Sequence, residues 1–184
     1  DRSNSFFTGK KNIIKAVDEV SFNIEAGESL GLVGQSGCGK TTTARSLCLL
    51  DPKTSGSVNF FNPEKNIMES IDAIDEEGMR VFRRNMQMIF QDPYESLNPR
   101  WNIKDIIKEP LDIHNIGTRK DRIDRAKELM LKVGLSDADL EKYPHQFSGG
   151  QRQRIGITRA LSINPEFIIC DEPVSALDLS LIHI

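Results

Sequence analysis

The stretch GQSGCGKT, from Gly34 to Thr41, constrains this chain most, because it fits the pattern G-x-x-x-x-G-K-[ST]. The apolar run SLGLVG (29–34) before it favours a strand, and KTTTARSLCLL (40–50) after it has apolar residues at helical spacing. In this order the glycines allow successive backbone N–H groups to turn inward, and the helix N-terminus adds a partial positive charge. The segment therefore predicts a polyphosphate cradle rather than a chance glycine-rich turn.

Two residues of this cradle have distinct predicted roles. Lys40 supplies a mobile cation for the β- and γ-phosphate oxygens, and the hydroxyl of Thr41 is a candidate ligand of Mg²⁺. Cys38 is expected to be a small filler of the loop. The predicted nucleotide contacts in this part of the chain are Gly34, Gln35, Ser36, Gly37, Cys38, Gly39, Lys40, Thr41 and Thr42.

Two adjacent acids end the apolar run FIIC and are followed by a proline (167–173). Side chains of neighbouring residues at a strand end point in different directions, so Asp171 is predicted to hold Mg²⁺ and Glu172 to polarise an attacking water as general base. Alone, two such acids would be read as a solvated strand end, but a phosphate cradle in the same chain favours catalysis. Gln91, which follows the buried run MQMIF, could reach the metal or the water, so it joins Lys40 and Glu172 as a predicted catalytic residue.

The remaining pattern predicts an α/β core with an inserted helical subdomain. Between Asp92 and Gln146, charged helical faces such as IKDIIKEPLDI and RKDRIDRAKELMLKVGL dominate. SGGQRQRIGITRAL then begins a helix with Ser148 as its N-cap residue. Strands are predicted at 14–24, where one leads into a second, at 56–61, 86–90 and 166–173, and a short helix at 75–84.

Composition excludes several classes of protein. With 184 residues the chain predicts one domain, or one domain with a small subdomain. A net charge of -3 argues against a nucleic-acid partner, since phosphate neutralisation normally needs a basic face. The three cysteines form no CxxC pair, and no apolar run approaches the length that crosses a bilayer. Any contact with a membrane would therefore be made through partner proteins.

A second anion cradle is predicted at SGGQ, because a Ser-Gly-Gly turn opens a helix there. The motifs GQSGCGKT, QDP, SGGQ, CDEP and SALD, in this order, resemble the ATPase subunits of ABC transporters. The resemblance implies a P-loop NTPase fold, with a RecA-like core, an antiparallel β part and a helical subdomain. It also implies ATP and Mg²⁺ as cofactors, and a head-to-tail dimer in which each ATP lies between the P-loop of one subunit and the signature turn of the other.

The same resemblance divides the chain. It implies a first part of the nucleotide-binding core at 1–91, a helical subdomain at 92–147, and the signature helix, Walker B strand and interface loop at 148–178. The interface loop is expected at Ser175 to Asp178. The signature contacts to the partner's ATP are expected from Ser148, Gly149, Gly150 and Gln151.

A finer resemblance, carried by QMIFQDPYESLNPRWNIKDIIKEPL and YPHQFSGGQRQRIGITRAL, is to the subgroup that energises oligopeptide, dipeptide and nickel importers. It implies transmembrane permease partners that contact the helical insertion, indirectly a solute-binding protein, and a place on the cytoplasmic face of the cell membrane. The plain alternative for Asn98, Pro99 and Arg100 is a turn. The alternative function is a soluble ABC ATPase of DNA repair or translation, which a coiled-coil insertion, zinc cysteines or a second cassette would indicate. A P-loop kinase or GTPase is disfavoured by SGGQ.

The end of the sequence predicts a C-terminally truncated fragment that hydrolyses little ATP. His183 comes too soon after Glu172 to be the switch histidine of the family, which a further strand carries. The six residues LSLIHI (179–184) are what CTG TCT CTT ATA CAC ATC would encode, and that string resembles a sequencing adapter. We therefore expect residues 179–184 to be a non-native tail.

Overall fold

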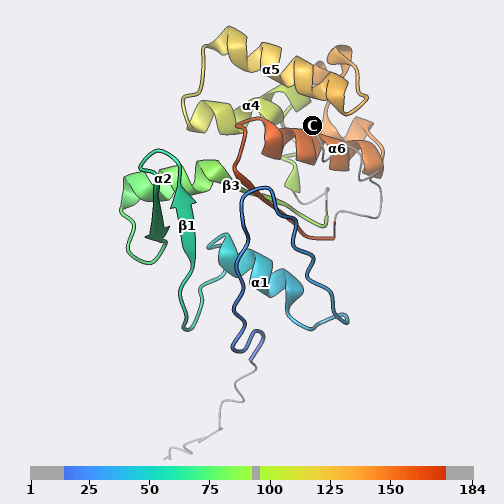
Figure 1. Cartoon of the computed structure of the whole chain (residues 1–184). Coiled ribbons are helices and arrows are strands. Elements are labelled where there is room, and N and C mark those ends of the chain that lie inside the picture. The colour runs from blue at the N-terminus through green and yellow to red at the C-terminus, as the bar shows by residue number, and fades with distance from the viewer. Residues whose placement is uncertain (1–14, 93–95, 173–184) are drawn as a thin grey trace, which may run out of the picture.

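A computed structural model of the chain describes residues 15–92 and 96–172. Helices α4 (Ile103–Ile113), α5 (Arg119–Lys132) and α6 (Gly149–Leu161) gather in the upper part of Figure 1, and α1 (Lys40–Leu47) lies in the lower part. Strand β3 (Met86–Ile89) runs between them. No helix within the described ranges is both long and apolar enough to cross a bilayer.

The α/β character rests on one parallel strand pair with a helix on each face. Met86–Ile89 of β3 pairs with Phe167–Cys170 of β4 in parallel. Because successive side chains of a strand point to opposite faces, Met88 and Ile89 contact different helices. Met88 packs with Ala44 of α1, whereas Ile89 packs with Ile157 and Ala160 of α6. This layering of helix, sheet and helix confirms the predicted fold class.

An antiparallel hairpin and a short helix form the remaining part of the core. Strand β1 (Asn59–Asn62) pairs with β2 (Ile67–Ser70) in antiparallel register. Helix α2 (Glu76–Asn85) begins at Asp75, whose side chain accepts a hydrogen bond from the Gly78 amide. Phe82 of α2 meets Phe60 of β1 edge to face, with ring centroids 5.1 Å apart. The predicted helix at 75–84 is confirmed, while the predicted strand at 56–61 lies a few residues later and β2 was not predicted.

The helical part has its own core, and its helices begin where side chains can cap them. Asn102, Thr118 and Ser148 each accept a backbone N–H of the first helical turn, which satisfies a donor that the helix itself leaves unpaired. Two 3₁₀ helices, η1 (Asp137–Glu141) and η2 (Pro144–Gln146), join α5 to α6. The buried core residues are Leu97, Ile103, Ile106, Ile107, Ala126, Met130, Val133, Leu135, Leu140, Phe147 and Ile155.

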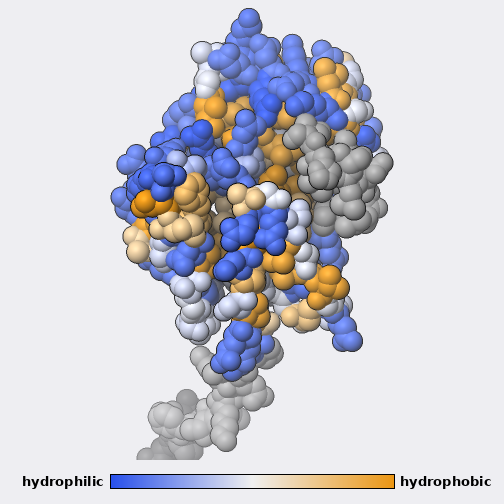
Figure 2. All heavy atoms as spheres, viewed as in Figure 1, coloured by the Kyte–Doolittle hydropathy of each residue, from blue (hydrophilic) through white to orange (hydrophobic). Residues whose placement is uncertain are grey.

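The predicted strands at 14–24 and 29–34 are wrong for the described residues. Residues 15–39 form neither helix nor strand, and Val33 is 98% exposed. Their apolar and β-branched residues suit a strand, but a strand also needs a hydrogen-bonded neighbour. Strands β3 and β4 pair with each other, and no strand of the described ranges pairs with residues 29–34. This segment contains the exposed apolar residues Leu30 and Leu32. Figure 2 shows orange, hydrophobic patches on the lower part of the molecule, where the segment runs.

Three predictions fall on residues outside the described ranges. They are the interface loop at 175–178, the position of His183 and the non-native tail at 179–184.

Candidate functional site

The loop between Gly34 and α1 has the glycines that its shape requires. Gly39 has a φ of +97° and Gly37 a φ of +77°, a left-handed region that glycine adopts without a steric penalty. A Cβ at Gly39 would also collide with the carbonyl oxygen of Ala16, and one at Gly34 would lie 2.6 Å from Sγ of Cys38. The loop therefore curves tightly at the start of α1, with the Cys38 thiol against Gly34.

The Lys40 ammonium folds back over this loop. Its Nζ donates hydrogen bonds to the carbonyl oxygens of Gly34 and Gln35, each at 3.0 Å. No acidic residue lies in the first turn of α1, and Gly39 offers no side chain to accept the first N–H groups of the helix. Because those N–H groups have no partner within a helix, this end of α1 combines free donors with a cation. The arrangement can bind a polyphosphate.

Thr41 and Asp171, 130 residues apart in the sequence, meet at the end of β4. The Thr41 hydroxyl donates to Oδ1 of Asp171 at 3.0 Å. The Asp171 backbone N–H donates to the Ile89 carbonyl oxygen at 3.0 Å, which fixes the residue against β3. Mg²⁺ prefers oxygen ligands and often takes only one or two from the protein when phosphates supply others. These two oxygens fit such an ion.

Glu172 turns away from that pair and toward Gln91. Nε2 of Gln91 donates to Oε2 of Glu172 at 2.7 Å, so the residues that follow the adjacent parallel strands β3 and β4 are joined. Glu172 has a φ of +48°, which is uncommon and strained for a residue with a Cβ and clusters at functional sites. The two adjacent acids diverge, as the sequence indicated, and Glu172 lies beside the glutamine with its carboxylate exposed.

The signature turn is exposed and lies apart from the phosphate cradle. Ser148 and Gln151 form a capping box at the start of α6: the Ser148 hydroxyl accepts the Gln151 N–H at 3.3 Å, and the Gln151 side chain accepts the Ser148 N–H at 2.9 Å. Among residues 15–92 and 96–172, no atom lies within 4 Å of a Cβ built on Gly149. Figure 1 shows α6 in the upper part and α1 in the lower part of the molecule. The fold therefore brings Lys40, Thr41, Asp171, Glu172 and Gln91 to one region but leaves the signature turn outside it.

The arginines of α6 are buried or half-buried, and each donates to a backbone carbonyl oxygen. Arg152 is only 6% exposed and donates to the Phe147 carbonyl oxygen at 2.9 and 2.6 Å. Arg154 donates to the Val133 carbonyl oxygen at 3.0 Å, and Arg159 to that of Ser96 at 2.6 Å. Burial lowers the pKa of Arg159. The partners are backbone carbonyls, which leave no pattern in a sequence, so residue types alone did not reveal them.

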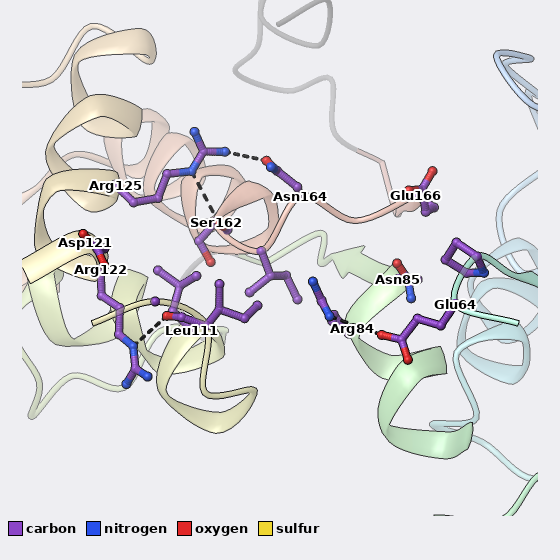
Figure 3. A pocket seen from close by; sticks show the side chains of 14 residues that line it. Glu64, Arg84, Asn85, Leu111, Asp121, Arg122, Arg125, Ser162, Asn164 and Glu166 are labelled. Atoms are coloured by element: carbon purple, nitrogen blue, oxygen red, sulfur yellow. Dashed lines mark hydrogen bonds and ion pairs between the residues drawn. The ribbon is translucent and has the colours of Figure 1, made fainter. Parts of the chain in front are cut away.

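A cavity of about 540 Å³ lies away from the cradle, between the hairpin and α2 on one side and α4, α5 and the end of α6 on the other (Figure 3). Arg84 and Glu64 form an ion pair on the side of the hairpin and α2, 3.3 Å apart. Arg125 donates to Oδ1 of Asn164 at 2.6 Å. The cationic groups of its wall are thus engaged by neighbouring groups, and none of the predicted site residues lines it.

Comparisons with known proteins identify the family of this chain. Residues 17–175 match the family described as ABC transporter. The chain is 53% identical over 176 residues to the oligopeptide transport ATP-binding protein OppF of Bacillus subtilis, covering 95% of this chain and 56% of that relative. It is 52% identical over 177 residues to the putative oligopeptide transport ATP-binding protein YkfD of the same organism, covering 96% of this chain and 52% of that relative. The chain thus spans about half the length of these curated relatives.

Solved structures of similar fold are ATP-binding cassettes. The dimeric structure of MJ0796, a bacterial ABC transporter cassette, has a TM-score of 0.78 and 31% identity, covering 96% of this chain and 74% of that one. A dimeric post-hydrolysis state of MJ0796 bound to ADP and phosphate has a TM-score of 0.72 and 32% identity, covering 87% and 67%. These similarities confirm the expected P-loop NTPase fold. With the family match over residues 17–175, they show that this chain belongs to the ABC transporter family.

Proposed function

We propose that this protein is the ATP-binding and ATP-hydrolysing subunit of an importer of oligopeptides or dipeptides. The observation that carries the proposal is the pair of hydrogen bonds Thr41–Asp171 and Gln91–Glu172 at one end of β3 and β4. It supports Mg²⁺ binding by Thr41 and Asp171 and the action of Glu172 as a base next to Gln91, beside the Lys40 cradle. The names of the relatives, which are oligopeptide transport ATP-binding proteins, favour transport over DNA repair or translation.

The chemistry follows from these positions. Lys40 and the N–H groups of residues 34–42 would bind the phosphates of ATP, and Thr41 and Asp171 would hold Mg²⁺, which neutralises phosphate charge. Glu172 would accept a proton from a water as that water forms a bond to the γ-phosphorus and the bond to the ADP oxygen breaks. Gln91 would orient the water. The Gln91 amide donates to Oε2 of Glu172, so Oε1 of that carboxylate and the amide oxygen of Gln91 would both be acceptors for the water.

The signature turn would act on the nucleotide of a second ATPase subunit. Ser148 and Gly149 are exposed and distant from the cradle of their own chain, which favours a head-to-tail pair. Both solved relatives named above are described as dimeric. Ser148, Gly149, Gly150 and Gln151 would then contact the partner's ATP, with permease subunits and, indirectly, a solute-binding protein completing the importer at the cytoplasmic face of the membrane.

We propose that the chain divides into three parts that correspond to these roles. Residues 1–91 would form the first part of the core, 92–147 the helical part, and 148–178 the signature helix with the strand and loop that follow it. The buried cluster around Ile103 supports the helical part as a packed unit. Helix α6 would belong to both parts, because Ile155 packs in that cluster and Ile157 packs on β3.

Cells that encode this protein provide the test of peptide import. Chromosomal replacement of Glu172 by Gln should abolish uptake of a labelled oligopeptide, because the importer would lose its energy source. Uptake of a free amino acid serves as the control and should not change. Peptide uptake at the unsubstituted rate would contradict the proposal.

Ser148→Ala tests the signature assignment in the full-length gene product. The change removes an N-cap, which costs about 1 kcal/mol of stability, and a hydroxyl that would contact the partner's ATP. We expect lower ATPase turnover with unchanged ATP binding by the single subunit.

Ser136→Ala is the matched control for this variant. Ser136 also closes a capping box, at η1, and its hydroxyl accepts the Ala138 N–H at 3.2 Å. We expect a similar loss of stability, measured by thermal unfolding, with unchanged turnover. Equal turnover in the two variants would refute the signature role of Ser148.

A further inference from the structure

Helix α6 contacts the segment around Gln91 on the strand side. Ile157 and Ala160 of α6 pack against Ile89, two residues before Gln91. The helix begins at Ser148, so its first turn carries the signature and its second half contacts the strand that leads to the glutamine. One rigid element therefore joins the two parts of the proposed site that the fold keeps apart.

Arg159 makes the corresponding contact on the other side of Gln91. Its Nη1 donates to the Ser96 carbonyl oxygen at 2.6 Å. Ser96 also lies close to α6 itself, with Oγ 4.0 Å from the position that a Cβ on Gly156 would occupy. The arginine fixes this approach with a charge-assisted hydrogen bond, which is stronger than a neutral one.

The surroundings of Arg159 make the contact specific. Burial lowers the pKa of its guanidinium, and the charge of Glu109 on α4 opposes that effect. A guanidinium that is removed from water binds a carbonyl oxygen at a defined angle, because its N–H groups form a planar fork. The contact therefore restrains Ser96, five residues after Gln91, relative to α6.

We propose that Arg159 is a positioning residue for ATP hydrolysis: by holding Ser96 on α6, it fixes the segment of Gln91 relative to the helix whose first turn is the signature. The inference rests on the proposed function. Binding of the partner's ATP at Ser148 would then act on Gln91 through α6. Arg159 itself touches neither ATP nor the water.

The test is a double-mutant cycle in the full-length gene product. Arg159→Met removes the donors and keeps much of the side-chain volume. We expect kcat for ATP hydrolysis to fall about tenfold, the effect of losing one charge-assisted hydrogen bond, with the Kd of ATP unchanged. In a Gln91→Ala background the same change should alter kcat by less than about twofold, because the residue on which it acts is already absent. Equal effects in both backgrounds would show a structural role only and refute the proposal.

Arg125→Met is the matched control. Arg125 donates to the backbone carbonyl oxygens of Leu161 and Ser162, each at 3.5 Å. It thus joins an arginine to backbone carbonyls at the C-terminal end of α6 rather than to the Ser96 carbonyl. We expect kcat of Arg125→Met to stay at the unsubstituted value.

Arg159→Lys keeps a cationic donor. Its kcat should be higher than that of Arg159→Met, and an equally low kcat would count against the hydrogen bond as the cause.

Hydrogen exchange separates failure of this inference from failure of the proposed function. Arg159→Met should speed amide exchange at residues 96–101 and leave α5 unchanged, whether or not the protein hydrolyses ATP. Unchanged exchange at residues 96–101 would refute the proposal that Arg159 restrains Ser96. Absence of hydrolysis by the unsubstituted protein would instead refute the proposed function.

Discussion

Replacing Glu172 by Gln in the full-length gene product should lower kcat for ATP hydrolysis by at least about 100-fold, the usual contribution of a general base. An amide cannot accept the proton of the attacking water, but it has nearly the shape of the carboxylate and can still accept the Gln91 hydrogen bond, which is 2.7 Å long in the unsubstituted chain. Lys40, Thr41 and Asp171 are unchanged, so the Kd of ATP should stay the same. Steady-state hydrolysis and equilibrium ATP binding measure the two quantities.

Glu166→Gln is the control for this result. Glu166 is exposed and lies next to the opposite end of β4, so the same chemical change is made one strand length away from the site. It should leave kcat unaltered. Unreduced turnover by Glu172→Gln would remove Glu172 from the mechanism.

Lys40→Ala should weaken ATP binding by about 100-fold, because hydrogen bonds to charged groups contribute about 1.5–3 kcal/mol each. The Lys40 ammonium donates hydrogen bonds to the carbonyl oxygens of Gly34 and Gln35. When ATP binds, the ammonium can donate to phosphate oxygens instead. Titration with a fluorescent ATP analogue measures the Kd. Lys65→Ala is the control: Lys65 is exposed on the hairpin, 2.8 Å from Glu69, and its loss should not change the Kd. Equal affinity in all three proteins would contradict the cradle assignment.

Local signals predicted much of the fold. The caps at Asn102, Thr118 and Ser148 and the apolar spacing of α4 and α6 lie within a few residues of each other in the sequence, so their helices could be found without knowledge of the rest. The strands at 14–24 and 29–34 could not be settled in this way. Strand composition is local, whereas a strand also depends on a neighbour that another part of the chain must supply.

In the candidate site, too, some contacts could be predicted from the sequence and others could not. Thr41 and Asp171 could be paired from sequence although they lie 130 positions apart, because both were predicted as Mg²⁺ ligands of one phosphate site. The direct Gln91–Glu172 hydrogen bond was not predicted, since either residue could equally have faced the water. The carbonyl partners of Arg152, Arg154 and Arg159 had no sequence signal, because every residue has a carbonyl group.

Successive side chains of β3 alternate between the two faces of the sheet, and this alternation limits how this gene can change in length. Met88 packs with α1 and Ile89 with α6, and the strand leads directly to Gln91. Inserting or deleting one codon within residues 86–90 would exchange the two faces, turning each side chain toward the wrong helix, and would move the glutamine by one position relative to Glu172. Related genes should therefore vary in length on either side of this segment, at loops such as the one between β1 and β2, while the stretch from Met86 to Gln91 keeps the same number of codons.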